Sequence, residues 1–204
     1  MIFFFIRRIV LAGMLAAICA PAVAQRHEIG LTLGRLVDQT RSAASGRLEL
    51  GTGTALQANY GYRLAGGAGA ALFGEVHFLA NPQRVISTSL GAATRDIASL
   101  YVTPGIRLKL LPAWKVSPWV AFGGGYAQYE HSTTRVDGRP NEAPRRTHRG
   151  ALSFGGGVDV KVLPFLSLRG EVRDFYSGSP DFNVAKPGGG QHNVVLGGGF
   201  VLRF

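Results

Sequence analysis

The chain has 204 residues, a formal net charge of +10 and a mean hydropathy of +0.14. Its 29 glycines are about twice the average share, and charged residues make up only 17% of it. This length suits one domain with a sizeable core. The single cysteine, Cys19, lies in a segment that we expect to be removed. The mature chain would then have no disulfide framework, thiolate metal site or cysteine nucleophile.

The first 24 residues have the features of a cleaved secretory signal peptide. Arg7 and Arg8 supply a positive start, residues 9–18 form an apolar run, and Ala22-Val23-Ala24 matches an A-x-A cleavage site. We therefore expect export through the Sec pathway and a mature chain of residues 25–204. A retained membrane anchor is the alternative, although the apolar run is too short to span a bilayer.

After this segment, apolar residues alternate with small or polar ones in eight stretches, as in β-strands with one apolar face. The predicted strands are 27–36, 53–64, 70–80, 98–110, 118–130, 149–162, 166–176 and 191–204. Their connections alternate between long and short. An outer-membrane barrel has this rhythm, with short periplasmic turns, longer extracellular loops and an even number of strands.

The sequence thus predicts an all-β fold for residues 25–204, an eight-stranded antiparallel up-and-down transmembrane β-barrel. The alternative is a soluble lipocalin-like barrel, which would bury the apolar face of every strand and turn the charged face to water.

The last strand ends in GGGFVLRF, with Phe200, Leu202 and Phe204 on the apolar face. With its eight alternating strands, its loop rhythm and this ending, the chain resembles the small OmpA/OmpX-type outer-membrane barrels. The resemblance implies the outer membrane of a Gram-negative-type bacterium, and outer-membrane lipids as partners. It also implies that these three residues form the signal read by the barrel-assembly machinery.

Aromatic residues near the periplasmic strand ends are expected to form a girdle at the membrane boundary. They are Tyr60, Tyr62, Trp119, Phe200 and Phe204.

The opposite face of the strands carries charges that would point into the lumen. Buried charges persist only when they are paired, so we predict an ion-pair network that plugs the lumen. Its predicted members are Glu75, Arg107, Lys109, Asp159, Lys161, Arg169, Glu171 and Arg173, and Arg203 is expected to turn inward at the periplasmic mouth. A small, weakly conducting channel is the alternative, disfavoured because eight strands leave little room for water.

Glycine triplets recur at 123–125, 155–157 and 197–199. The inward glycines would make room for long side chains. The outward ones, Gly124, Gly156 and Gly198, would form a shallow lipid-facing groove with Gly74 and Gly170. This groove could seat an acyl chain or a second protomer, whereas tolerance of strand curvature is the simpler explanation.

The connection 131–148 is the most polar and is rich in arginine. Arg135, Arg139, Arg145, Arg146 and Arg149 suit bidentate contacts with lipopolysaccharide phosphates. The alternative is a solvated loop without a ligand. Nucleic acid is not expected as a partner of an exported chain.

An enzymatic role would need a catalytic group at the outer lipid boundary. His192, Asp174 and Ser177 are at similar predicted heights, as in barrels that deacylate or palmitoylate lipid A. No H-x-S motif or metal-binding spacing supports the group. We expect no enzyme activity, no cofactor and no metal. The expected role is structural or surface-interacting, with a lipid A-modifying enzyme as the alternative and the oligomeric state left open.

Overall fold

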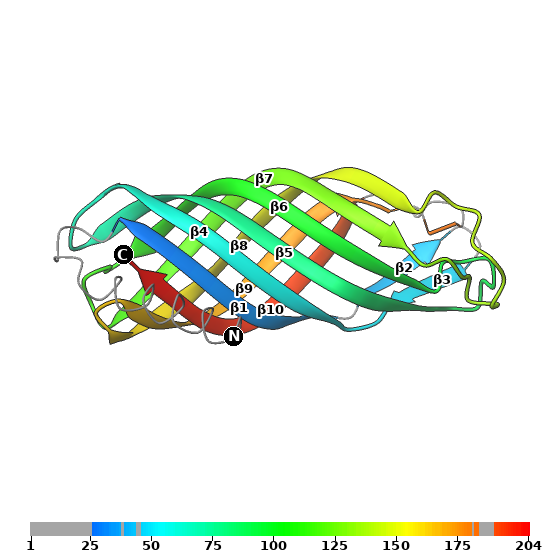
Figure 1. Ribbon diagram of the computed structural model, residues 1–204, viewed down its shortest axis with the longest axis horizontal. Coiled ribbons are helices and arrows are strands. Elements are labelled where there is room, and N and C mark those ends of the chain that lie inside the picture. The colour runs from blue at the N-terminus through cyan, green and yellow to red at the C-terminus, as the bar shows by residue number, and fades with distance from the viewer. Residues whose placement is uncertain (1–25, 38, 44–45, 181, 184–189) are drawn as a thin grey trace, which may run out of the picture.

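The computed structural model describes residues 26–37, 39–43, 46–180, 182–183 and 190–204 (Figure 1). The predicted signal peptide, residues 1–24, lies outside them. No helix in the described part is long and apolar enough to cross a membrane.

Ten strands make up the regular structure of the described residues. They are β1 (His27–Leu36), β2 (Gln39–Ala43), β3 (Gly46–Leu50), β4 (Gly53–Gly66), β5 (Ala70–Thr88), β6 (Asp96–Leu110), β7 (Val116–His131), β8 (Arg146–Leu163), β9 (Leu166–Gly178) and β10 (Gly190–Arg203).

Eight of these strands form a closed antiparallel ring (Figure 1). Each strand from β4 to β9 pairs with the next strand along the chain. β1 closes the ring because it pairs with both β4 and β10. The closing ladder runs from Glu28 opposite Arg203 to Leu36 opposite Val195. The predicted eight-stranded antiparallel barrel is confirmed.

The two ends of the barrel differ. Tight turns and the C-terminus lie at one end, which we call the short-turn end (Figure 1). The long connections, with β2 and β3, lie at the other, which we call the long-loop end.

The outward face of the ring is apolar, as the alternation predicted. Leu33, Val120 and Leu196 are each about 60% exposed, and the same face of every ring strand carries further exposed apolar side chains. Water would not stabilise such a belt, whereas the hydrocarbon core of a bilayer would. The ring therefore has the transmembrane arrangement rather than that of a soluble lipocalin-like barrel.

The long-loop end is more regular than predicted. Connections 37–51 and 81–96 were expected to be loops, but the first contains β2 and β3, and the second is shortened by the extension of β5 to Thr88. Leu48 and Leu50 of β3 lie opposite Thr88 and Ile86 of β5. The alternation Arg47-Leu48-Glu49-Leu50 accounts for this, since one face of β3 is apolar.

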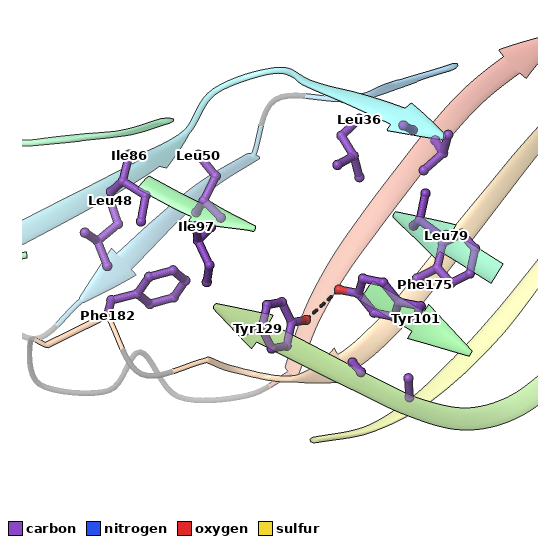
Figure 2. Packing of buried hydrophobic residues seen from close by; sticks show 14 of the residues in the cluster. Leu36, Leu48, Leu50, Leu79, Ile86, Ile97, Tyr101, Tyr129, Phe175 and Phe182 are labelled. Carbon is purple, nitrogen blue, oxygen red and sulfur yellow. Dashed lines mark hydrogen bonds between the residues drawn. The ribbon is translucent and has the colours of Figure 1, made fainter. Parts of the chain in front are cut away.

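A hydrophobic core fills this end from the inside (Figure 2). Leu48, Leu50 and Phe182 are at most 1% exposed in the part beyond the ring, and Tyr101 and Phe175 continue the core into the barrel. The extension therefore has the packed interior of a soluble domain.

Candidate functional site

Below this core, toward the short-turn end, the lumen contains a connected set of charged side chains. Its first centre is Glu28, whose carboxylate lies 2.7 Å from Arg107 Nη2, 2.7 Å from Lys109 Nζ and 3.1 Å from Arg203 Nε. All four side chains are at least 92% buried. Three cations from two other strands, β6 and β10, therefore neutralise this one carboxylate.

Two further carboxylates extend the set. Asp159 accepts two hydrogen bonds from Arg169, of 2.7 and 3.0 Å, and also lies 2.7 Å from Lys109 Nζ. Glu75 lies 2.7 Å from Arg107 Nε and 2.9 Å from Arg173 Nη2. The result is one continuous series of contacts, which we call the ion-pair chain. It comprises Arg173, Glu75, Arg107, Glu28, Lys109, Asp159 and Arg169, with Arg203 attached to Glu28.

Two residues of the predicted network lie outside this chain. Lys161 is one inward position nearer the short-turn end than Asp159, and its side chain donates a 3.3 Å hydrogen bond to the Ala113 carbonyl. Glu171 is buried, but its carboxylate accepts a hydrogen bond from Gln57 Nε2 at 2.9 Å instead of pairing with a cation within 4 Å. Neighbouring amide and carbonyl groups bind these two side chains, so shared parity alone did not determine membership.

Two side chains that lie in the lumen were not predicted there from the sequence. Glu28 has the same parity as the inward Gly30 and Thr32, which was a usable signal. Trp119 was expected in the aromatic girdle, but it is 2% exposed and lies inside, with Arg169 4.8 Å above its ring. Its parity is that of the inward Ala121, and Gly157 on β8 leaves space for it, since a Cβ there would lie 2.7 Å from the indole ring.

The upper lumen contains a neutral polar layer. The Tyr101 and Tyr129 hydroxyls hydrogen-bond to each other (Figure 2). Asn193 Nδ2 donates to the Tyr101 hydroxyl at 2.8 Å. Ser177 also lies here, with its hydroxyl on that of Tyr129. The lumen is thus filled by charges below and by aromatic and apolar side chains above.

The arginines of connection 131–148 fall into two groups. Arg139, Arg145 and Arg146 have 62 to 78% exposed side chains. Arg135 is only 22% exposed, and Arg149 donates to the Ser179 carbonyl at 2.9 Å. The first group is accessible to a ligand, whereas the second braces the loops.

Acidic neighbours partly neutralise the exposed group. Arg145 and Arg146 share Glu130, at 3.0 and 3.7 Å, and Arg139 lies 3.9 Å from Asp137.

His192 and Asp174 form an outward-facing pair. His192 Nδ1 lies 2.6 Å from Asp174 Oδ2, and Asp174 Oδ1 also accepts the Asn193 N–H at 3.1 Å. Ser177, the third member of the predicted group, is 1% exposed and faces the lumen. Odd and even positions of β9 point to opposite sides of the sheet, so the Asp174/His192/Ser177 group does not assemble.

The predicted assembly residues face outward at the short-turn end. Phe200, Leu202 and Phe204 are 38 to 47% exposed. The His27 ring stacks on Phe204 with centroids 5.4 Å apart, and its Nδ1 lies 2.8 Å from the Tyr60 hydroxyl. These side chains form an aromatic cluster where the two ends of the ring meet.

The outward glycines do not line one common groove. Gly124 lies in a groove of about 440 Å³ with Gly150, Leu152 and Tyr176. Gly198 lies in a separate groove of about 490 Å³ that spans the closure between β1 and β10, with Leu31 and Phe78. Neither groove includes Gly74, Gly156 or Gly170.

In the part of the chain that the structure describes, no group of three or more His, Cys, Asp and Glu side chains could hold a metal ion.

Comparison with known proteins supports the fold. No family model and no curated protein sequence matches the chain. The crystal structure of Neisserial surface protein A is similar over 89% of this chain and 98% of its own, at 13% identity and a TM-score of 0.54. The outer membrane protein OprG from Pseudomonas aeruginosa is similar over 88% of this chain and 96% of its own, at 12% identity and a TM-score of 0.54.

The outer membrane protease OmpT from Escherichia coli is also similar over 92% of this chain and all of its own, at 9% identity. Its TM-score of 0.44 is too low to carry an argument about activity. The first two structures show that this chain has the fold of the small outer-membrane β-barrels, the family that its sequence resembles.

Proposed function

We propose that the chain is an outer-membrane protein of a Gram-negative-type bacterium with a structural or surface-interaction role. Export through the Sec pathway and removal of residues 1–24 are parts of this proposal. In this orientation the short-turn end faces the periplasm and the long-loop end faces the medium. The apolar outward belt supports the location, and the barrel fold is the one found in outer-membrane proteins.

The observation that carries the proposed role is the filled lumen beneath an ordered extension. The ion-pair chain occupies the lower lumen, and the core around Leu48, Tyr101 and Phe175 occupies the upper lumen. Such a barrel presents a rigid surface outside the cell rather than a path through the membrane. A conducting channel is accordingly disfavoured, and single-channel recording in planar bilayers tests this.

The partner that suits this surface is the phosphate of lipopolysaccharide. Arg139, Arg145 and Arg146 lie at the long-loop end with exposed guanidinium groups. Arginine binds phosphate through two parallel hydrogen bonds. Arg135 and Arg149 are better explained as braces of the loops.

Titration with lipopolysaccharide tests this partner. The triple variant Arg139→Gln/Arg145→Gln/Arg146→Gln should bind at least about tenfold more weakly than the unmodified barrel. A matched control neutralises three other exposed arginines, in Arg26→Gln/Arg35→Gln/Arg47→Gln, and should bind normally. Equal loss in both triple variants would mean that net charge, rather than this surface, determines binding.

The second candidate is a lipid-modifying enzyme, and the 2.6 Å contact between His192 and Asp174 favours it. A carboxylate that orients an imidazole is a common part of acyl-transfer sites. No serine nucleophile joins the pair, since Ser177 faces the lumen. Mass spectrometry of lipid A from cells that produce the His192→Ala variant tests this candidate, and an unchanged lipid A profile would remove it.

Barrel assembly provides the last part of the proposal. Phe200, Leu202 and Phe204 would be read by the assembly machinery before the ring closes, because all three remain outward on the last strand.

A further inference from the structure

A cavity of about 650 Å³ opens at the short-turn end, below the ion-pair chain. Its lining includes Arg63, Lys115, Lys161 and Arg203, and Glu28 is its only carboxylate. Phe73 and the two periplasmic turns add apolar walls. A volume of this size is within the range that holds small-molecule ligands.

Within the described structure, three of these cations lack a carboxylate partner. The Arg63 side chain donates to the Gly67 carbonyl at 3.3 Å, and the Lys161 side chain donates to the Ala113 carbonyl, also at 3.3 Å. No carboxylate of the described residues lies within 4 Å of either side chain or of Lys115. Glu28 does not compensate for them, because Arg107, Lys109 and Arg203 already surround it.

Three of these cations lie on strands of the ring near the short-turn end. Arg63 on β4, Lys161 on β8 and Arg203 on β10 have the inward parity of their strands and lie within three residues of the strand ends, with Glu28 opposite Arg203. They therefore surround the mouth of the lumen instead of facing the lipid. A concave site lined by one sign of charge, with apolar walls, concentrates the field and attracts counter-ions.

A hydroxyl nearby also lacks a partner. Ser167 is the residue opposite Lys161 in the ladder between β8 and β9, and it is fully buried on the inward side. Its Oγ has no hydrogen-bond partner within the described structure. A buried hydroxyl without a partner is uncommon in folded proteins, but Ser167 does not line the cavity, so the cations alone carry the site.

We propose that this mouth is a binding site for a phosphate-bearing anion that arrives from the periplasmic side. A phosphate monoester carries nearly two negative charges and three acceptor oxygens. It can therefore engage Arg63, Lys115 and Lys161 together, which a single carboxylate cannot. The apolar wall at Phe73 suits an organic group attached to the phosphate.

Titration calorimetry of the detergent-solubilised barrel with inorganic pyrophosphate at low ionic strength tests the site. Saturable binding of one pyrophosphate per barrel is expected. Arg63→Gln and Lys161→Gln should each weaken it by about tenfold. The control Arg35→Gln, at an exposed arginine on β1, should leave the affinity unchanged, and heat-modifiable gel mobility should show that every variant is folded.

Absence of saturable binding, or unchanged affinity in the folded Arg63→Gln/Lys161→Gln double variant, would overturn the proposal. So would an equal loss in Arg35→Gln. This outcome is independent of lipopolysaccharide binding, which depends on the arginines of the other end.

The lipid that surrounds the barrel distinguishes the two sources of the phosphate, a soluble ester and a lipid headgroup. In nanodiscs of phosphatidylcholine and of phosphatidylglycerol, equal pyrophosphate affinity indicates a soluble periplasmic phosphate ester. Loss of affinity only with phosphatidylglycerol, at an ionic strength that screens the charge of the bilayer, indicates that a lipid headgroup occupies the mouth. Both results keep the phosphate site.

Discussion

Glu28→Gln is the substitution that tests the ion-pair chain most directly. The change keeps the shape of the side chain but removes the charge that Arg107, Lys109 and Arg203 share. The chain contains five cations and three carboxylates, so the variant would leave five cations with two. Glu28 is only 3% exposed, so water cannot replace the lost interactions.

Removing one partner from a buried ion pair costs about 3–5 kcal/mol. We expect a loss near the middle of that range, about 4 kcal/mol, in the free energy of unfolding. The three contacts are not independent, so their separate contributions do not add. The double variant Glu28→Gln/Lys109→Met, which removes one of the stranded cations as well, should recover part of the loss.

Urea unfolding of the barrel in lipid vesicles measures this free energy. Trp119 lies in the lumen beside the chain, so its fluorescence should report the transition. The matched control is Glu130→Gln, which breaks two pairs at a carboxylate that is 34% exposed and should cost at most about 1 kcal/mol. If Glu28→Gln were no more destabilising than Glu130→Gln, the ion-pair chain would not stabilise the barrel.

Three further changes probe other parts of the molecule. Gly157→Ala should lower the free energy of unfolding by about 1–3 kcal/mol in the same urea assay, because the new Cβ would lie 2.7 Å from the Trp119 ring. The control Gly150→Ala, where the Cβ would meet open space, should have little effect. Lys161→Met should change the unfolding free energy by less than about 1 kcal/mol, since Lys161 has no carboxylate within 4 Å in the described structure. Deletion of Phe204 should lower the amount of heat-modifiable barrel in the outer membrane, and normal insertion would show that this aromatic residue is not part of an assembly signal.

The ring could be predicted from the sequence because the side-chain period of a strand is two. The outward residues of all eight ring strands followed from parity alone, as Leu33 on β1 and Leu196 on β10 illustrate. The loop rhythm then gave the order and direction of the strands. Both signals are local, and neither depends on how side chains meet across the lumen.

The contacts inside the lumen could not be predicted in this way. Parity placed Lys161 and Asp159 on the same inward face. Among the described residues, however, only Asp159 has side chains of opposite charge within 4 Å. Height along the strand suggested a girdle position for Trp119, although its parity placed it inside. Membership of the ion-pair chain depends on ladder register between distant strands, as for Glu28 and Arg203, and that register is not visible in one strand.

The long-loop end shows why β2 and β3 were missed. On β1 the inward side carries Glu28 and Thr32 and the outward side carries Leu31 and Leu33, so the polarity is that of a membrane barrel. On β3 the order is reversed, with Leu48 buried and Glu49 exposed. A search for strands with apolar outward faces passes over a strand of the opposite polarity.

This reversal has a physical cause. Within the bilayer the outside of the ring must be apolar, and a polar interior prevents a strand from slipping by one residue, since the slip would turn charges toward lipid. Beyond the bilayer the outside faces water, so the apolar side chains must be inside, where Leu48, Leu50 and Phe182 pack. The change from Leu33 outside to Leu48 inside therefore marks where the lipid ends. The ion-pair chain and the hydrophobic core are then the two interiors that one continuous sheet needs on either side of that boundary.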